Sequence, residues 1–387
     1  MKIAQIGSFP LDAACIKGGV EASVYGLVLE QAKNHIVSVL DIPRPEIEVD
    51  QKVLVENIQV FRFSSKGNSN YSGLLRVKTI LKIIKDLDPD ICHIHTTSLF
   101  SFVIYLLLKI NGLKTIVTIH GLAHIEKQNT WRGKKNLKNI LKLVVQSFTE
   151  FVFLTFCPIC IVDTRYVESA IMKYRKQWKI FHIPICKVIP QGIDSVFFNV
   201  VGTESINKKL FSVGSLSKRK GHLALIQAMN KVRTVYPDFS LSIAGILAEN
   251  NYFELMQKSI QVSGLQENIH IYPNATFKQI LKLYSESEIF VLHSQEESQG
   301  IVFCEAMAAG KSIVATNVGG IPWVVENNVN GLLSDYGDSD TFADNIIKLM
   351  NDNKLRKEIE KNNRNVSHKY DWQIISDQIM EVYNLVI

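Results

Sequence analysis

Two glutamates flank a glycine in the second half of this 387-residue chain, at Glu297, Gly300 and Glu305. An apolar run at 289–292 precedes them, and a helical pattern follows Gly300. This order predicts a buried strand, a loop and a helix that begins near Gly300, where free amides and the helix dipole favour an anion such as a diphosphate. The amides concerned are those of Gly300, Ile301 and Val302.

The two carboxylates differ in their predicted setting. Glu297 stays in the loop, while Glu305 lies one to two turns into the helix, so the two can flank one ligand from different sides. A glutamate carboxylate accepts hydrogen bonds well from ribose hydroxyls. Taken one at a time, helix capping would explain Glu297 and a surface salt bridge would explain Glu305.

Three other segments contribute residues that could meet a ligand. The basic run Lys218–Lys220 follows an apolar run and, standing alone, would be a solvated turn. Gly18 and Gly19 follow the first apolar run and open a helical pattern, which alone is a weak signal. His120 ends the apolar run 115–119, and ligands of doubly wound sheets bind at that end of the strands.

The elements that must position these residues alternate along the chain. Short apolar runs, separated by helical patterns, lie at 3–6, 36–40, 91–94, 115–119, 159–162 and 188–189, and again at 210–213, 241–243, 269–272, 289–292 and 312–315. Such alternation predicts an α/β fold with two doubly wound, Rossmann-like domains that face each other across a cleft.

A polar, irregular stretch at 199–209 predicts the linker between the two domains. The tail 372–387 has apolar residues at helical spacing, so we expect a helix that crosses back onto the first domain. The predicted domains are therefore 1–196 together with 372–387, and 197–371.

Composition narrows the function classes. The chain is 47% hydrophobic and 21% charged, as folded proteins are, and its net charge of +6 is too small for a nucleic-acid binder. Six scattered cysteines, with one CxxC at Cys157 and Cys160, favour reduced thiols in a core over disulfides, zinc or redox chemistry. We see no export signal and expect a cytoplasmic protein without a metal site.

A basic amphipathic helix is predicted after residue 126. Six basic residues and one acidic residue lie within 126–142. Apolar residues follow helical spacing at Leu137, Leu141, Val144 and Phe148, and Lys135, Lys138 and Lys142 lie to one side of that stripe. An ordinary surface helix and docking onto an anionic membrane surface explain this pattern equally well. The apolar runs 99–110 and 151–162 are too short to span a bilayer.

The motifs together resemble the retaining glycosyltransferases of family four. Glu297 to Glu305 resembles the family's E-x7-E signature, and the resemblance continues through Glu-Ala-Met-Ala and Gly310 to Gly319-Gly320-Ile321-Pro322 and Asn330-Gly331-Leu332-Leu333. The loop Gly214-Ser215-Leu216-Ser217-Lys218-Arg219-Lys220-Gly221 resembles the family's G-R-L-x-x-x-K-G loop, with Ser215 in place of arginine. Lys218 or Arg219 could supply the missing cation.

The first half of the chain carries weaker parts of the same resemblance. They are the Gly18-Gly19-Val20-Glu21 loop, the strand end Thr118-Ile119-His120-Gly121 and the turn Ile189-Pro190-Gln191-Gly192-Ile193-Asp194. Gln191 stands where asparagine is usual and Lys311 where proline is usual, and we expect neither to touch the ligand groups.

The resemblance implies a GT-B fold with an acceptor-side first domain and a donor-side second domain. It implies a retaining, metal-independent, hexosyltransferase-like enzyme with no cofactor, which moves sugar from a nucleotide-sugar donor to a glycan or lipid-linked acceptor. Cell-surface polysaccharide biosynthesis is the implied setting. If the basic helix docks on lipid, we expect this cytoplasmic protein at the inner face of the membrane. The implied catalytic residues are His120 and Glu297. The implied donor-binding residues are Gly18, Gly19, Ser215, Lys220, Ser298, Gly300, Ile301, Val302 and Glu305.

Two rival functions stay open. A nucleotide-sugar epimerase of related architecture would use the same donor groove without an acceptor, and a non-catalytic nucleotide- or glycan-binding protein would keep the site only to bind. Other classes lack their motifs, because the chain has no G-x-G-x-x-G, no G-x-x-x-x-G-K-[ST] and no G-x-S-x-G.

Overall fold

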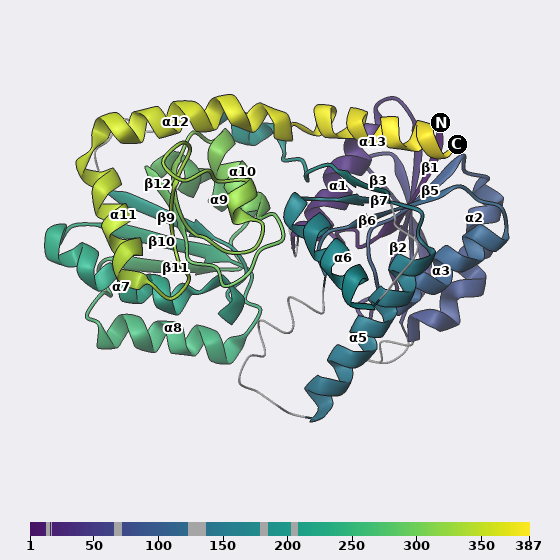
Figure 1. The fold of residues 1–387 in the computed structure, drawn as a ribbon, viewed down its shortest axis with the longest axis horizontal. Helices are drawn as coiled ribbons and strands as arrows, with labels where there is room; N and C mark the ends of the chain where they lie inside the picture. The colour runs from purple at the N-terminus through teal and green to yellow at the C-terminus, as the bar shows by residue number, and fades with distance from the viewer. Residues whose placement is uncertain (13–15, 17, 66–71, 123–136, 179–184, 203–207) are drawn as a thin grey trace. The chain divides into compact units, whose positions relative to one another are not determined.

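A computed structural model describes residues 1–12, 16, 18–65, 72–122, 137–178, 185–202 and 208–387 (Figure 1). The chain forms two compact units. Unit 1 comprises Met1–Gly192 and Trp372–Ile387, and unit 2 comprises Ile193–Asp371.

Unit 1 is built on a sheet whose strand order is β3-β4-β2-β1-β5-β6-β7-β8. The strands are β1 (Lys2–Gly7), β2 (Ile36–Asp41), β3 (Gln51–Val55), β4 (Ile58–Arg62), β5 (Ile91–Ile94), β6 (Thr115–Ile119), β7 (Ile159–Val162) and β8 (Ile185–Val188). All neighbouring pairs are parallel except β3 and β4. β5 and β6 are buried along their whole length, and most of their residues are apolar.

The sequence pattern did not indicate the β3–β4 hairpin, and β8 begins three residues before its predicted start. The two hairpin residues, Glu56 and Asn57, both have positive φ, of 49° and 66°. Two-residue hairpin turns of this kind match the twist of the strands they join. The sequence carries Asn there without the usual glycine, so the turn signal was weak.

Helices cover both faces of the unit 1 sheet (Figure 1). They are α1 (Gly19–Ala32), α2 (Val77–Leu87), α3 (Leu99–Ile110), α5 (Leu137–Phe156), α6 (Arg165–Trp178) and α13 (Trp372–Val386). Apolar residues of α1 and α13 pack with one side of the strands, and those of α2, α3, α5 and α6 pack with the other.

The C-terminal helix α13 docks on α1 through Trp372. A Cβ atom on Gly26 would lie 2.1 Å from Trp372 Nε1, and one on Gly192 would lie 2.4 Å from Trp372 Cδ2. The indole therefore occupies space that only glycine leaves open on both sides. This packing holds the end of the chain on the first unit.

Unit 2 has a parallel sheet in the order β11-β10-β9-β12-β13-β14. Its strands are β9 (Lys209–Val213), β10 (Ser240–Gly245), β11 (Ile269–Pro273), β12 (Ile289–Leu292), β13 (Ser312–Thr316) and β14 (Leu332–Ser334), the last of which was not predicted. Its helices are α7 (His222–Val235), α8 (Asn250–Val262), α9 (Phe277–Glu286), α10 (Ile301–Ala308), α11 (Ser339–Asn351) and α12 (Asn353–Ser367). Separate apolar clusters pack against its two faces.

The prediction of two doubly wound α/β domains is confirmed. In unit 2 the chain leaves β9 for β10 and β11 on one side, then returns beside β9 with β12. The loops after β9 and β12 therefore diverge at a topological switch point, where doubly wound sheets bind ligands.

Candidate active site

Lys220 and Glu297 meet at this switch point of unit 2. Lys220 ends the loop after β9, and Glu297 lies in the loop between β12 and α10. Lys220 Nζ lies 2.5 Å from Glu297 Oε1, and the two residues are 7% and 4% exposed. A buried ion pair this close stays stable only because both partners are hydrogen-bonded.

Two other groups hold the Glu297 carboxylate. Arg219 Nη1 lies 3.3 Å from Glu297 Oε2, and the Ser294 hydroxyl donates to Glu297 Oε1 at 2.8 Å. Burial by itself raises the pKa of Glu297, but the charges of Lys220 and Arg219 and these hydrogen bonds outweigh burial and leave that pKa below its ordinary value. Glu297 is therefore ionised near neutral pH.

Glu305 lies in a different electrostatic setting on α10. Burial raises the pKa of Glu305 to about 7, against smaller lowering effects of a Tyr284 hydrogen bond and the Lys220 charge. The Tyr284 hydroxyl lies 3.3 Å from Glu305 Oε2. Near neutral pH, Glu305 therefore exchanges between its protonated and ionised forms.

The N-terminus of α10 starts where the sequence predicted. Gly300 caps the helix in the left-handed region with φ of 79°, and Ile301 is the first helical residue. Ser298, Gly300, Ile301 and Val302 are all partly exposed. These partly exposed residues lie at the end of the helix dipole that attracts anions.

Two glycines of the loop after β13 pack against this segment. The amide of Gly320 donates to the Glu297 carbonyl at 2.7 Å. A Cβ on Gly320 would lie 1.8 Å from the Ser298 carbonyl oxygen, and a Cβ on Gly319 would lie 2.2 Å from the Glu297 carbonyl oxygen. The Gly319-Gly320 motif is thus needed for backbone contact with the site loop.

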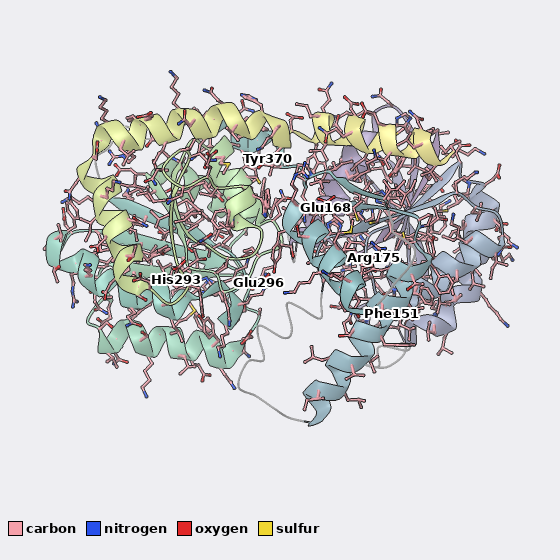
Figure 2. The ribbon with its side chains drawn as sticks, in the orientation of Figure 1. Phe151, Glu168, Arg175, His293, Glu296 and Tyr370 are labelled. Carbon is pink, nitrogen blue, oxygen red and sulfur yellow. The ribbon has the colours of Figure 1, made fainter. Side chains whose placement is uncertain are left out.

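Ser215 leaves the loop after β9 without the usual arginine. Its hydroxyl lies 3.1 Å from the Ser217 hydroxyl. Of the two cations that the sequence analysis named as substitutes, Lys218 is exposed, whereas Arg219 contacts the β12–α10 loop at the Glu296 carbonyl, 3.0 Å away, and at the Glu297 carboxylate. His293 and Glu296, labelled in Figure 2, belong to that same loop.

The remaining predicted residues lie in unit 1. Gly18 caps α1 and Gly19 is its first residue. His120 directly follows β6, and its Nδ1 lies 3.2 Å from Asp163 Oδ2. Within the described residues, His120 Nε2 is buried and has no hydrogen-bond partner.

Two histidines missed by the sequence analysis lie beside His120. The ring centroids of His93 and His95 are 4.0 Å apart, and those of His95 and His120 are 5.7 Å apart. Burial, with a smaller effect of His120, lowers the pKa of His93 to about 3, and burial lowers that of His95 well below its ordinary value. Both rings therefore stay uncharged and serve as hydrogen-bonded structure.

Helix α13 contributes Tyr383 to the hydrogen bonds that hold the His93 and His95 rings. The Tyr383 hydroxyl lies 2.7 Å from His93 Nδ1, and His93 Nε2 lies 2.7 Å from the Thr118 hydroxyl. His95 Nε2 donates to Gln5 Oε1 at 2.7 Å. His93 and His95 are therefore oriented by groups from β1, β6 and α13.

Asp163, Gln191 and Ser294 were not singled out as site residues. Asp163 directly follows the apolar run 159–162 and Ser294 nearly follows 289–292, so position at a strand's carboxyl end was the signal that could have found both. Gln191 donates to Asp163 at 2.5 Å and so reaches His120 indirectly.

The predicted basic helix is described only in part. Lys135 and the side chains of Leu137, Lys138 and Lys142 lie outside the described residues. On the described part of α5, the apolar stripe is exposed: Leu141 by 64%, Val144 by 58% and Phe148 by 65%. In the part of the chain that the structure describes, no helix is long and apolar enough to cross a bilayer.

Fold and site together define an α/β protein of two doubly wound units that presents cations and a helix N-terminus at the switch point of unit 2. Two family profiles match this chain in succession. Glycosyltransferase Family 4 matches residues 17–195, and Glycosyl transferases group 1 matches residues 197–366. The chain belongs to glycosyltransferase family 4, as its motifs predicted.

Individual relatives agree with this assignment. The phosphatidyl-myo-inositol mannosyltransferase of Mycolicibacterium smegmatis is 25% identical over 395 residues, which covers 100% of this chain and 94% of that protein. Two other curated relatives match over about half of their own length, 54% and 48%.

Solved structures show the GT-B fold. Sucrose-phosphate synthase from Thermosynechococcus elongatus has a TM-score of 0.82 at 18% identity, covering 99% of this chain and 98% of its own. Anabaena HepE in complex with UDP-glucose has a TM-score of 0.74 at 20% identity, covering all of both chains.

Proposed function

We propose that this chain moves a sugar from a nucleotide-sugar donor to a glycan or lipid-linked acceptor, with retention of anomeric configuration and without a metal ion. Unit 2 would bind the donor and unit 1 the acceptor. The observation that carries the proposal is the cluster of Lys220, Arg219 and Glu297 beside the N-terminus of α10. Cell-surface polysaccharide biosynthesis is the setting we propose for the reaction.

The donor diphosphate would lie against the α10 amides and Lys220. These groups place positive charge where the leaving diphosphate gains negative charge, which is the kind of preorganised stabilisation that often dominates catalysis. Arg219 is the cation that we propose in place of the arginine missing at position 215, because it reaches the site loop from the same turn as Lys220. Protein cations and amides would then provide the charge that other transferases take from a metal.

The reaction would proceed on one face of the sugar. The bond between the anomeric carbon and the diphosphate oxygen breaks, the acceptor oxygen bonds to that carbon, and the acceptor proton passes to the departing diphosphate oxygen. Glu297 would orient the sugar while positive charge develops on it, Glu305 would accept from the ribose hydroxyls, and His120 would contact the transferred sugar. Glu297 is suited to this because it is ionised and firmly held.

Peripheral attachment to the inner, cytoplasmic face of a membrane is part of the proposal. Its support is the exposed apolar stripe of α5. An ordinary surface helix buries such a stripe in the core, whereas an interfacial helix inserts it among lipids. A lipid-linked acceptor would then lie at the same surface as the enzyme.

Binding and turnover test the proposal together. Thermal shift against UDP, GDP and ADP identifies the base, since a ligand at 100 times its dissociation constant stabilises the protein by about 2.7 kcal/mol. Turnover of UDP-glucose, UDP-N-acetylglucosamine and GDP-mannose is then followed with and without added glycan or membrane lipid. Acceptor-dependent release of nucleoside diphosphate is expected. Conversion of the donor to an epimer would favour the epimerase. Nucleotide binding without turnover would favour a non-catalytic nucleotide- or glycan-binding protein.

A further inference from the structure

Asp163 carries two hydrogen bonds on one oxygen atom. This carboxylate, which follows β7, is 2% exposed. Gln191 Nε2 donates to Asp163 Oδ2 at 2.5 Å, and His120 Nδ1 lies 3.2 Å from the same oxygen. Three segments that follow β6, β7 and β8 thus meet at one buried carboxylate.

The chemistry of these groups settles which nitrogen of His120 holds the proton. Asp163 Oδ2 already accepts from Gln191 Nε2, and a carboxylate oxygen accepts in the same way from an imidazole N–H, so His120 Nδ1 is the donor. When the ring carries a single proton, Nε2 therefore keeps a bare lone pair. That nitrogen is buried and has no partner within the residues that the structure describes, and His120 lines a small pocket of unit 1 together with Thr118, Asp163 and Gln191.

We propose that Asp163 is a positioning residue that holds His120 in its Nδ1–H tautomer, so that Nε2 accepts a hydrogen bond from a hydroxyl of the transferred sugar. Gln191 keeps the Asp163 carboxylate in place. The inference rests on the proposed function, because that function assigns the sugar to His120. A histidine whose second nitrogen is held by a carboxylate is fixed in tautomer and in ring orientation.

The neighbouring rings leave this pair undisturbed. His95 stacks on His120 with an interplanar angle of 14°, but its Nε2 donates to Gln5 and does not compete for Asp163. His93 is engaged on both nitrogens by Tyr383 and Thr118. The tautomer of His120 therefore depends on Asp163.

Long-range ¹H–¹⁵N correlation spectra of the full chain labelled with ¹⁵N-histidine report the tautomer, and His120→Gln assigns the signal. We expect Nδ1–H in the wild type, a shift toward Nε2–H in Asp163→Asn, and the wild-type pattern in Asp163→Glu. The matched control is Asp238→Asn, which changes an exposed aspartate paired with Lys208 in unit 2. Melting curves check that each variant is folded, and Asp163→Glu decides the question if Asp163→Asn does not fold.

Kinetics separate positioning from a merely structural role. With whichever of UDP-glucose, UDP-N-acetylglucosamine and GDP-mannose turns over fastest, kcat should fall about tenfold to a hundredfold in Asp163→Asn and recover in Asp163→Glu. The calorimetric Kd for the matching nucleoside diphosphate should stay unchanged, because that ligand is assigned to unit 2.

Three results would overturn the proposal: Nε2–H in the wild type, an unchanged tautomer in Asp163→Asn, or a changed tautomer with unchanged kcat. Failure of the transferase function looks different. If the wild type binds no nucleotide and turns over no sugar donor, the proposed transferase function is wrong, and the sugar contact of His120 is wrong with it. The spectra would still show whether Asp163 sets the tautomer of His120.

Discussion

The side-chain nitrogen of Lys220 lies 2.5 Å from Glu297 Oε1, although the two residues are 77 positions apart in the chain. The pair places a cation and an anion in one buried site beside a helix N-terminus. In the absence of donor, Glu297 neutralises Lys220. An incoming diphosphate must therefore share or replace that contact.

Loss of Lys220 should weaken nucleotide binding. Lys220→Ala removes a charged hydrogen-bond partner, so nucleoside diphosphate affinity should fall by about one to two decades, or about 1.5–3 kcal/mol. The melting temperature should fall too, because Glu297 is left buried beside fewer cations. Lys218→Ala, in the same turn but exposed, is the control and should leave calorimetric Kd near the wild-type value. Equal affinity of all three proteins would remove Lys220 from the donor site.

Substitutions of Glu297 and Glu305 should have different effects on kcat and on nucleotide affinity. Glu297→Gln keeps the shape of the side chain but loses the charge, so kcat should fall by more than nucleotide affinity does, since the sugar becomes charged only in the transition state. Glu305→Ala should chiefly weaken nucleotide binding, because the ribose is remote from the bond being broken. Calorimetry beside steady-state kinetics separates the two. Wild-type nucleotide affinity in Glu305→Ala contradicts the ribose assignment.

Nucleotide binding should be coupled to the proton on Glu305. Burial raises the pKa of Glu305 to about 7, and only its ionised form accepts from both ribose hydroxyls without giving up an oxygen. Binding should therefore lower that pKa and release protons near neutral pH, and affinity should weaken as pH falls below about 7. Calorimetry in buffers of different ionisation enthalpy counts the protons. In Glu305→Gln the release should disappear; if it persists, another group is responsible.

Membrane docking should depend on the exposed stripe of α5. The double variant Leu141→Glu with Phe148→Glu should lose co-sedimentation with phosphatidylglycerol vesicles, because each change puts a charge where an apolar side chain would insert. Val262→Glu is the matched control, since Val262 is 79% exposed on unit 2. Replacing Lys135, Lys138 and Lys142 with glutamate, which reverses their charge, should also release the protein from the vesicles. Vesicle binding that is the same in every variant would end the membrane proposal.

Helix α13 should depend on Gly26 for its docking. Gly26→Ala puts a methyl group into the space of the Trp372 indole, so we expect overpacking that destabilises the protein by about 1–3 kcal/mol and lowers the melting temperature. Gly18→Ala is the control for stability, because its backbone is extended and, apart from its chain neighbours, no atom of the described residues lies within 4 Å of the added methyl group. Equal melting of Gly26→Ala and wild type would mean that Trp372 moves at little cost.

The sequence by itself determined the local parts of the site. The strands at 91–94, 115–119, 159–162 and 289–292 were predicted to the residue, because parallel strands covered on both faces are rich in apolar and β-branched residues. The helix start near Gly300 followed from glycine's access to positive φ, which is also a local property. The E-x7-E spacing and the glycine loops were then enough to indicate the family.

Only the tertiary structure decided which of these parts meet. Lys220 reaches Glu297 because β9 and β12 are neighbours in the sheet, and strand order is not written in the apolar pattern of either strand. His120 and Asp163 are 43 positions apart, and His93 and Tyr383 are 290 apart. The periodicity of α5 likewise showed an apolar stripe but not that it is left exposed. Contacts of this kind depend on packing between distant segments, which local propensity and spacing do not encode.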